Sequence, residues 1–419
     1  MAHESLLSDA FLRELIAVGQ VDVLVGLPTL DNAATVGEVA RAVHAVFTGE
    51  LARQRTVLIN SDGGSTDGTP EIVRSLGERD TLLASHPLRT LHRVVAPFHG
   101  LPGKRAAVQR IFTAADLTQA RAVAILDPEG PTATPDRVLD LLAPVLSGQV
   151  DVLVPRQRRH PRDGLLVSQL VRPFIRAVYG AAIDEPLGSE FACTGRFAGA
   201  VIDDEGWRRE GLRPGIDLWL RTTAVARGFR VGQVWRPART APTRAQRRPT
   251  LRHTVEEVTR ALFECLAAHD AHWRGDLPHV ELSSWGTEPP PPAEPPIWDP
   301  QPMLDEARRG LHQLEPLLAR MLRPDTMSAI ARAAATPGAG LDDEAWVAAA
   351  YELAAASHHQ AFRNEHLARA NVPIYLARAG SFLRRTAHVS EAEVHGQLDA
   401  LAREFALRRP VLVERWNAG

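Results

Sequence analysis

The stretch AVAILDPEGPTATPD, residues 122 to 136, decides the fold. Its first five residues form an apolar run typical of a buried parallel strand, and Asp127-Pro128-Glu129 ends that run abruptly. Two carboxylates one residue apart at the carboxyl end of a strand lie where open α/β sheets bind ligands, and their hard oxygens suit a divalent cation on a diphosphate. The alternative is a strand-end turn with solvated acids, because Asp, Pro and Gly all favour turns.

Strands and helices alternate on both sides of this stretch. We expect strands over 21–27, 56–60, 92–96, 122–126, 150–154 and 230–235. We expect helices over 4–19, 33–51, 165–179, 215–227 and 254–269, and others beginning at Pro70 and Lys104. This alternation predicts a Rossmann-like α/β fold with a mostly parallel sheet.

The composition changes at residues 283–302, SSWGTEPPPPAEPPIWDPQP, which are dense in proline and typical of a semi-rigid spacer. We therefore divide the chain into an α/β domain (1–282), a Pro-rich linker (283–302) and an α-helical C-terminal domain (303–419). Helices are expected there over 304–322, 342–362, 365–383 and 391–408, and Ser390 with Glu393 has the spacing of a capping box. Amphipathic helices beyond a linker need their apolar faces covered, so we expect a homo-oligomer.

Composition excludes several classes of protein. A formal net charge of −2 and a pI of about 6.8 argue against a general affinity for nucleic acid or for an anionic membrane. Only two cysteines occur, Cys193 and Cys265, so we expect neither a disulfide framework nor a zinc-thiolate site, and a cytoplasmic location fits. The N-terminus lacks the features of a signal peptide, and no apolar run is long enough to span a membrane.

The loops after the first two expected strands also carry candidate ligand-binding residues. They read GLPTLD from Gly26 to Asp31 and DGGSTDG from Asp62 to Gly68. An acid at a strand end can accept hydrogen bonds from a nucleobase or a ribose, and glycines let the backbone approach a flat ligand. Turns of this composition also occur for steric reasons alone.

Taken in order, GLPTLDNA (26–33), SDGGSTDGT (61–69), LPGKRAA (101–107) and LDPEG (126–130) resemble the nucleotide-sugar half of a GT-A glycosyltransferase. Farther along, EPLGSEF (185–191) is similar to the PLGGE segment of the mannosylglycerate and glucosyl-phosphoglycerate synthases. Mannosylglycerate synthase is the most similar of this group, because GID (215–217), FEC (263–265) and DDEAW (342–346) have counterparts there in the same order.

The resemblance implies a donor site and a metal site. The implied donor-binding residues are Pro28, Leu30, Asp31, Asp62, Lys104 and Asp127. Asp127 and Glu129 match the DxD motif that holds Mg²⁺ or Mn²⁺, with Glu in place of the second Asp. The histidine that completes the family's metal shell is absent from 236–248. In an active enzyme, either water takes the place of this histidine, or arginines 239, 244, 247 and 248 neutralise the diphosphate. A decayed or repurposed enzyme is the third alternative.

The resemblance also implies an acceptor site and an activity. The implied acceptor-binding residues are Arg162, Ser168, Leu187, Gly188 and Asp217, and the implied catalytic residues are Asp217 and Glu190. Asp217 could instead be a first-turn helix charge. The expected activity is a retaining transfer of mannose or glucose from GDP-mannose or UDP-glucose to D-glycerate or a similar small hydroxy acid, which would make a compatible solute. The alternatives are another acceptor, such as a phosphoglycerate or a lipid carrier, and a non-catalytic sugar-nucleotide-binding scaffold.

Overall fold

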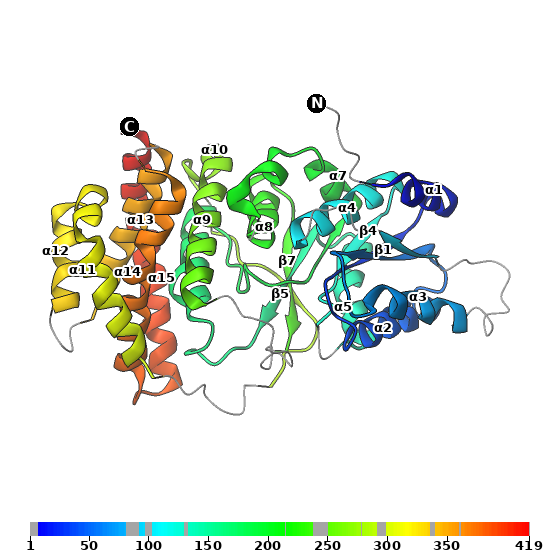
Figure 1. Cartoon of the computed structure of the whole chain (residues 1–419), viewed down its shortest axis with the longest axis horizontal. Helices are drawn as coiled ribbons and strands as arrows, with labels where there is room; N and C mark the ends of the chain where they lie inside the picture. The colour runs from blue at the N-terminus through cyan, green and yellow to red at the C-terminus, as the bar shows by residue number, and fades with distance from the viewer. Residues whose placement is uncertain are drawn as a thin grey trace.

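The structure is a computed structural model. It describes residues 7–80, 92–96, 103–129, 133–213, 215–237, 250–277, 279–290, 299–335, 340–359 and 362–418. The predicted fold class is confirmed within these ranges: a mostly parallel α/β sheet is followed by a helical C-terminal region (Figure 1).

Eight described strands form one sheet in the order β3-β2-β1-β4-β6-β5-β7-β8. Their bounds are β1 Val23–Thr29, β2 Thr56–Asp62, β3 His92–Ala96, β4 Ala122–Ile125, β5 Val152–Gln157, β6 Phe191–Thr194, β7 Val231–Arg236 and β8 Ser284–Trp285. All pairs are parallel except those of β6, which runs antiparallel between β4 and β5. The six predicted strands are present, whereas β6 and β8 were not predicted. Two residues of the stretch predicted as a linker therefore extend the sheet.

Helices cover both faces of the sheet (Figure 1). The bounds of those up to α10 are α1 Asp9–Val18, α2 Val36–Thr48, α3 Thr69–Asp80, α4 Lys104–Leu117, α5 Pro135–Leu146, α6 Arg172–Tyr179, α7 Gly195–Val201, α8 Ile216–Ala226, α9 Leu251–Ala268 and α10 Asp270–Trp273. Along β1 the alternation of a strand sends Val23, Val25 and Leu27 into one core and Leu24 into the other. Gly26 faces α4, where a Cβ atom would lie 2.5 Å from Ile111 Cδ1, so only glycine permits this close packing.

One predicted helix contains an irregular turn. Residues 165–179 are helical throughout, and the π-helical turn η1 Val167–Val171 leads directly into α6. Pro173 has no N–H to donate to the carbonyl of Gln169, and that carbonyl accepts a hydrogen bond from Trp346 Nε1 at 2.8 Å instead. Short 3₁₀ turns, η2 Glu205–Arg208 and η3 Glu210–Leu212, precede α8.

The C-terminal region contains α11 Gln301–Met321, α12 Pro324–Ala335, α13 Asp343–His358, α14 Asn364–Thr386 and α15 Glu391–Asn417. The capping box of Ser390 and Glu393 at the start of α15 is confirmed. Helix α14 packs on α9 and α11, and α15 packs on α6 and α13, so one hydrophobic core runs from the sheet into this region. This core already covers much of the apolar surface of these helices. The expectation of a homo-oligomer, which rested on uncovered apolar faces, therefore loses support. No described helix is long and apolar enough to cross a bilayer.

Candidate functional site

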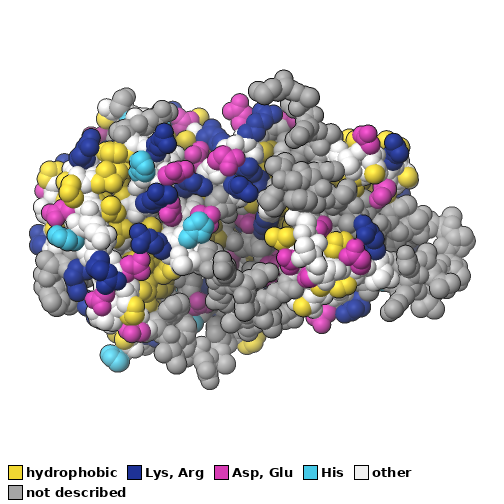
Figure 2. Space-filling model, viewed as in Figure 1, with side chains coloured by type: hydrophobic (Ala, Val, Ile, Leu, Met, Phe, Trp, Pro, Cys, Tyr) yellow, Lys and Arg dark blue, Asp and Glu magenta, His cyan; other side chains and the backbone are white. Residues whose placement is uncertain are grey.

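The sheet order reverses between β1 and β4, since β2 and β3 lie on one side of β1 and β4 lies on the other. Open α/β sheets bind ligands in the crevice outside the carboxyl ends of the strands at such a point. The loop that starts at Leu30 follows β1, and the acidic pair follows β4. Figure 2 shows the molecule hollowed near the middle of one face, with acidic side chains inside the hollow.

The acidic pair sits in a tight turn. Asp127 Oδ1 accepts a hydrogen bond from the N–H of Glu129 at 3.0 Å, which folds the chain around Pro128. Asp127 Oδ2 accepts from Ser189 Oγ at 2.5 Å, and Glu129 Oε1 accepts from Asn32 Nδ2 at 3.4 Å. The turn interpretation and the ligand-site interpretation are therefore both compatible with this geometry, because the turn presents two half-buried carboxylates at the switch point.

Lys104 and Asp217 meet directly, although 113 positions separate them. Lys104 is the first residue of α4, and Asp217 lies in the first turn of α8. Lys104 Nζ lies 2.7 Å from both carboxylate oxygens of Asp217 and donates to the carbonyl of Ser189 at 2.9 Å. Ser189 thus touches Asp127 through its side chain and Lys104 through its backbone. A residue predicted for the donor and one predicted for the acceptor lie side by side.

Two arginines that the sequence analysis did not single out complete this cluster. Arg236, at the end of β7, donates from Nε to Glu190 Oε2 at 3.1 Å, while Glu190 Oε1 accepts from the N–H of Asp127 at 3.4 Å. Arg221 donates to the carbonyls of Gly188 and Glu190 at 2.6 and 3.1 Å. The sequence could have indicated Arg221, because it follows Asp217 by four residues and therefore lies on the same face of the expected helix.

Arg221 is buried, and this burial lowers the pKa of its guanidinium while the nearby Asp217 carboxylate opposes that change. Its NH1 lies 3.7 Å from Asp217 Oδ1. Arg221 therefore connects the segment 188–190 to the start of α8 and places a positive charge next to Asp217.

The loops after β1 and β2 interlock. Asp62 accepts hydrogen bonds from Thr29 Oγ1, from the N–H groups of Gly64 and Ser65, and from Ser65 Oγ, at 2.5 to 2.9 Å. Asp31, with a positive φ of 53°, accepts from the N–H of Thr66 at 2.9 Å. Asp31 and Asp62, both predicted to bind the donor, thus stabilise the loops after β1 and β2 in this structure.

The two apolar residues predicted beside the donor differ in exposure. Pro28 is half-buried within β1, and Leu30 is 48% exposed just beyond that strand. Leu30 therefore presents apolar surface at the edge of the crevice.

The predicted acceptor residues lie in three places. Gly188 lies beside the cluster, where a Cβ atom would come within 2.3 Å of Pro155 Cγ, and Leu187 packs on the core next to it. Ser168 lies in the π-turn η1. Arg162 contacts the C-terminal region instead, because its NH2 donates to the carbonyl of Thr386, the last residue of α14, and to that of Val389. In this structure Arg162 fixes the C-terminal helices to the α/β part.

The donor atoms of the acidic pair suit a divalent cation. Mg²⁺ and Mn²⁺ prefer oxygen ligands, and Mg²⁺ is commonly held by one or two carboxylates together with substrate phosphates and water. Within the described ranges, no group of three or more His, Cys, Asp or Glu side chains is placed to hold a metal. Asp127 and Glu129 would thus hold the ion together with the ligand. Arginines 239, 244, 247 and 248, and with them most of the segment 236–252, lie outside the described residues, as do Pro102 and Pro214.

Comparisons with known proteins give a low-identity likeness. The chain is similar to glucosyl-3-phosphoglycerate synthase from Mycobacterium tuberculosis in complex with Mn²⁺, uridine-diphosphate and glucosyl-3-phosphoglycerate, with 21% sequence identity, coverage of 64% of this chain and 87% of that chain, and a TM-score of 0.43. The same synthase with Mg²⁺ and uridine-diphosphate gives 20% identity, 62% and 83% coverage, and a TM-score of 0.42. Its complex with Mn²⁺, uridine-diphosphate-glucose and phosphoglyceric acid gives 19% identity, 62% and 84% coverage, and a TM-score of 0.41.

No family model and no curated protein matches the chain. Identities and TM-scores of this size do not establish a function, and none of these comparisons singles out mannosylglycerate synthase. The assignment of a function therefore depends on the residues of the site.

Proposed function

We propose that the protein is a hexosyltransferase that moves a sugar from a nucleoside diphosphate to a hydroxyl group of a small acceptor. The observation that carries the proposal is the contact between Lys104 and Asp217, with Asp127 one residue away through Ser189. A cationic group suited to a diphosphate thus lies beside an acidic group suited to a hydroxyl at the switch point of the sheet. A sugar would be transferred there from the diphosphate to the hydroxyl.

The proposed donor half consists of Lys104 and the acidic pair. A divalent ion, when bound, neutralises charge that develops on the leaving diphosphate. Asp127 and Glu129 would hold that ion, and Lys104 would turn from Asp217 toward a diphosphate oxygen, since an ammonium group serves as a point charge for phosphate. The bond from the anomeric carbon to the diphosphate breaks as the bond to the acceptor oxygen forms. The diphosphate leaves with the bonding electrons, and one of its oxygens takes up the proton of the acceptor hydroxyl.

The proposed acceptor half is centred on Asp217. A carboxylate at the start of α8 can accept a hydrogen bond from the acceptor hydroxyl and so orient its oxygen toward the sugar. Arg221 forms an ion pair with Asp217, and Arg236 forms an ion pair with the neighbouring Glu190. We propose retention of anomeric configuration, with Asp217 orienting the acceptor and no in-line base required.

For the acceptor we keep the expectation drawn from the sequence, D-glycerate or a similar small hydroxy acid, with mannose or glucose as the sugar. A mannosylglycerate synthase-like activity that makes a compatible solute is the finer form of this proposal. The nearest alternative is the same transfer to a phosphoglycerate or to a lipid carrier. A non-catalytic sugar-nucleotide-binding protein is the alternative from another class, and it rests on the histidine missing from 236–248 and on Glu129 in place of the second Asp.

The test is a transfer assay with GDP-mannose and UDP-glucose, each with D-glycerate and 3-phosphoglycerate, with and without Mn²⁺. We expect nucleoside diphosphate release that depends on the acceptor and falls by a factor of at least about 100 in Asp127→Ala, the loss of about 3 kcal/mol of stabilisation of the leaving diphosphate. Asp136→Ala, which removes an acid from the start of α5, is the matched control. Nucleotide binding without transfer to any acceptor would favour the non-catalytic alternative.

A further inference from the structure

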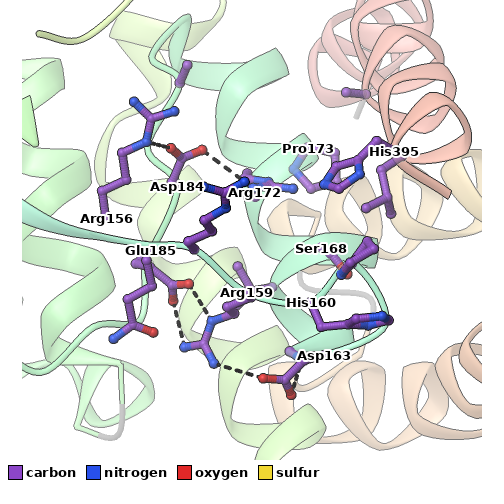
Figure 3. A pocket seen from close by; sticks show the side chains of 18 of the residues that line it. Arg156, Arg159, His160, Asp163, Ser168, Arg172, Pro173, Asp184, Glu185 and His395 are labelled. Atoms are coloured by element: carbon purple, nitrogen blue, oxygen red, sulfur yellow. Dashed lines mark hydrogen bonds and ion pairs between the residues drawn. The ribbon is translucent and has the colours of Figure 1, made fainter. Parts of the chain in front are cut away.

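A cavity of about 420 Å³ lies where the sheet meets the C-terminal helices (Figure 3). The ends of β5 and β7, the π-turn η1 with α6, the segment 182–185 and the first half of α15 line it. Its volume is within the range of small-molecule sites, roughly 300–1,000 Å³. A three-carbon acid would fill only part of this space.

The cavity is lined by charges that neutralise one another. Five arginines face six carboxylates, and the ion pairs are Arg156 with Asp184 at 2.7 Å, Arg158 with Glu288 at 3.1 Å, Arg159 with Glu185 at 2.5 Å and Arg172 with Asp184 at 3.4 Å. Figure 3 shows Asp184 between two arginines and Arg159 between Glu185 and Asp163. Arg156, Arg158 and Arg159 therefore do not form a free anion site, because an anionic ligand would have to displace these carboxylates.

Two polar side chains in the wall have atoms without a partner. Neither Ser168 Oγ nor Gln157 Oε1 has a hydrogen-bond partner among the described residues, although both atoms are buried and Ser168 is only 8% exposed. Buried polar atoms are nearly always hydrogen-bonded, so an unpaired hydroxyl and an unpaired amide oxygen in residues that line one cavity leave two hydrogen-bonding positions for a ligand. Ser168 also lies in a π-turn, a local geometry found frequently at functional sites.

The cavity adjoins the reaction cluster along two segments. Glu185 lines the cavity, and the same loop continues to Gly188, Ser189 and Glu190 in the cluster. Trp235 lines the cavity, and the next residue, Arg236, holds Glu190. A ligand in the cavity would thus lie next to the proposed site of transfer.

We propose that this cavity binds an uncharged polyhydroxylated compound, a sugar or a polyol. Hydroxyl groups both donate and accept hydrogen bonds, so they match a wall of paired guanidinium and carboxylate groups without altering its charge. They would also supply a donor to Gln157 Oε1 and a partner to Ser168. This binding is separate from the proposed function, in which the acceptor is a small hydroxy acid.

The experiment is calorimetric titration of the full chain, without donor, using maltose, D-glycerate and 3-phosphoglycerate as probes. Ala402→Trp fills the cavity from α15, and Ala406→Trp, on the exposed side of the same helix, is its matched control. Ser168→Ala removes the unpaired hydroxyl, and Ser357→Ala, in α13, is the control for that change. Thermal unfolding of each variant checks that it is folded.

We expect maltose to bind the wild type and Ala406→Trp alike, to bind Ala402→Trp at least tenfold more weakly, and to bind Ser168→Ala about 2- to 10-fold more weakly, as expected for one hydrogen bond. Two results would overturn the proposal: no maltose binding to the wild type, or tighter binding of 3-phosphoglycerate that Ala402→Trp abolishes. A failure of sugar transfer with maltose binding intact would instead refute the proposed function.

Discussion

The contact between Lys104 and Asp217 can be tested by a double-mutant cycle. Lys104 Nζ lies 2.7 Å from both carboxylate oxygens, and the two side chains are only 29% and 14% exposed. Hydrogen bonds to charged groups of this kind contribute about 1.5–3 kcal/mol, which corresponds to roughly 10- to 150-fold in the unfolding equilibrium constant. Lys104→Met and Asp217→Asn should therefore each lower the free energy of unfolding of the ligand-free protein, measured in urea, by about that amount.

The two effects should not add, because each change removes the same contact. We predict a coupling energy of about 1.5–3 kcal/mol between them. The control pairs Asp217→Asn with Arg105→Met, since Arg105 also lies in the first turn of α4 but contacts Arg209 and Glu210. That pair should be additive. Additive losses of unfolding free energy for Lys104 and Asp217, with coupling below about 0.5 kcal/mol, would refute this contact and with it the observation on which the proposed function rests.

Three further predictions concern the loop at Gly188, the contact of Arg162 and a buried histidine. Gly188→Ala should destabilise the protein by about 1–3 kcal/mol in urea unfolding and lower transfer, because its Cβ would clash with Pro155, whereas Gly396→Ala, with open space around it, should not. Arg162→Ala should lower stability by about 1–3 kcal/mol and leave the acceptor KM unchanged, and a raised KM with unchanged stability would show acceptor binding instead. Burial lowers the pKa of His269 from 6.5 to about 4, so the unfolded chain takes up the proton first and stability falls as the pH drops through this interval. Between about pH 7 and about pH 5 the free energy of unfolding should fall by about 2 kcal/mol more than in His269→Gln, and equal slopes would contradict this.

The sequence predicted the parallel strands because each is a short apolar run that ends in turn residues. The run 122–126 illustrates this, since it became β4 with the acidic pair just beyond it. Strand β6 could not be predicted in the same way, because its apolar run has only three residues, Phe191 to Cys193, and its neighbours in the sheet, β4 and β5, lie far from it in the sequence. Strand β8 has only two residues within a proline-rich stretch.

Contacts between distant segments account for what the sequence missed in the site. Strand-end position predicted that Asp127 would lie where open α/β sheets bind ligands, and the strand order places it at the switch point. The contact of Lys104 with Asp217 brings the two predicted halves together. Nothing local showed that Arg162 reaches the end of α14, or that carboxylates from other loops pair with Arg158 and Arg159. Ion pairing of this kind depends on tertiary structure, which periodicity and motif spacing do not report.

The most direct test of the central claim is a crystal structure of the full chain with UDP and Mn²⁺. The proposal predicts a metal ion on Asp127 and Glu129, the diphosphate on that ion with Lys104 turned toward it, and the nucleoside along the loops after β1 and β2. A nucleotide bound elsewhere, or no nucleotide bound at saturating concentration, would contradict the claim that the switch point between β1 and β4 is a sugar-nucleotide site.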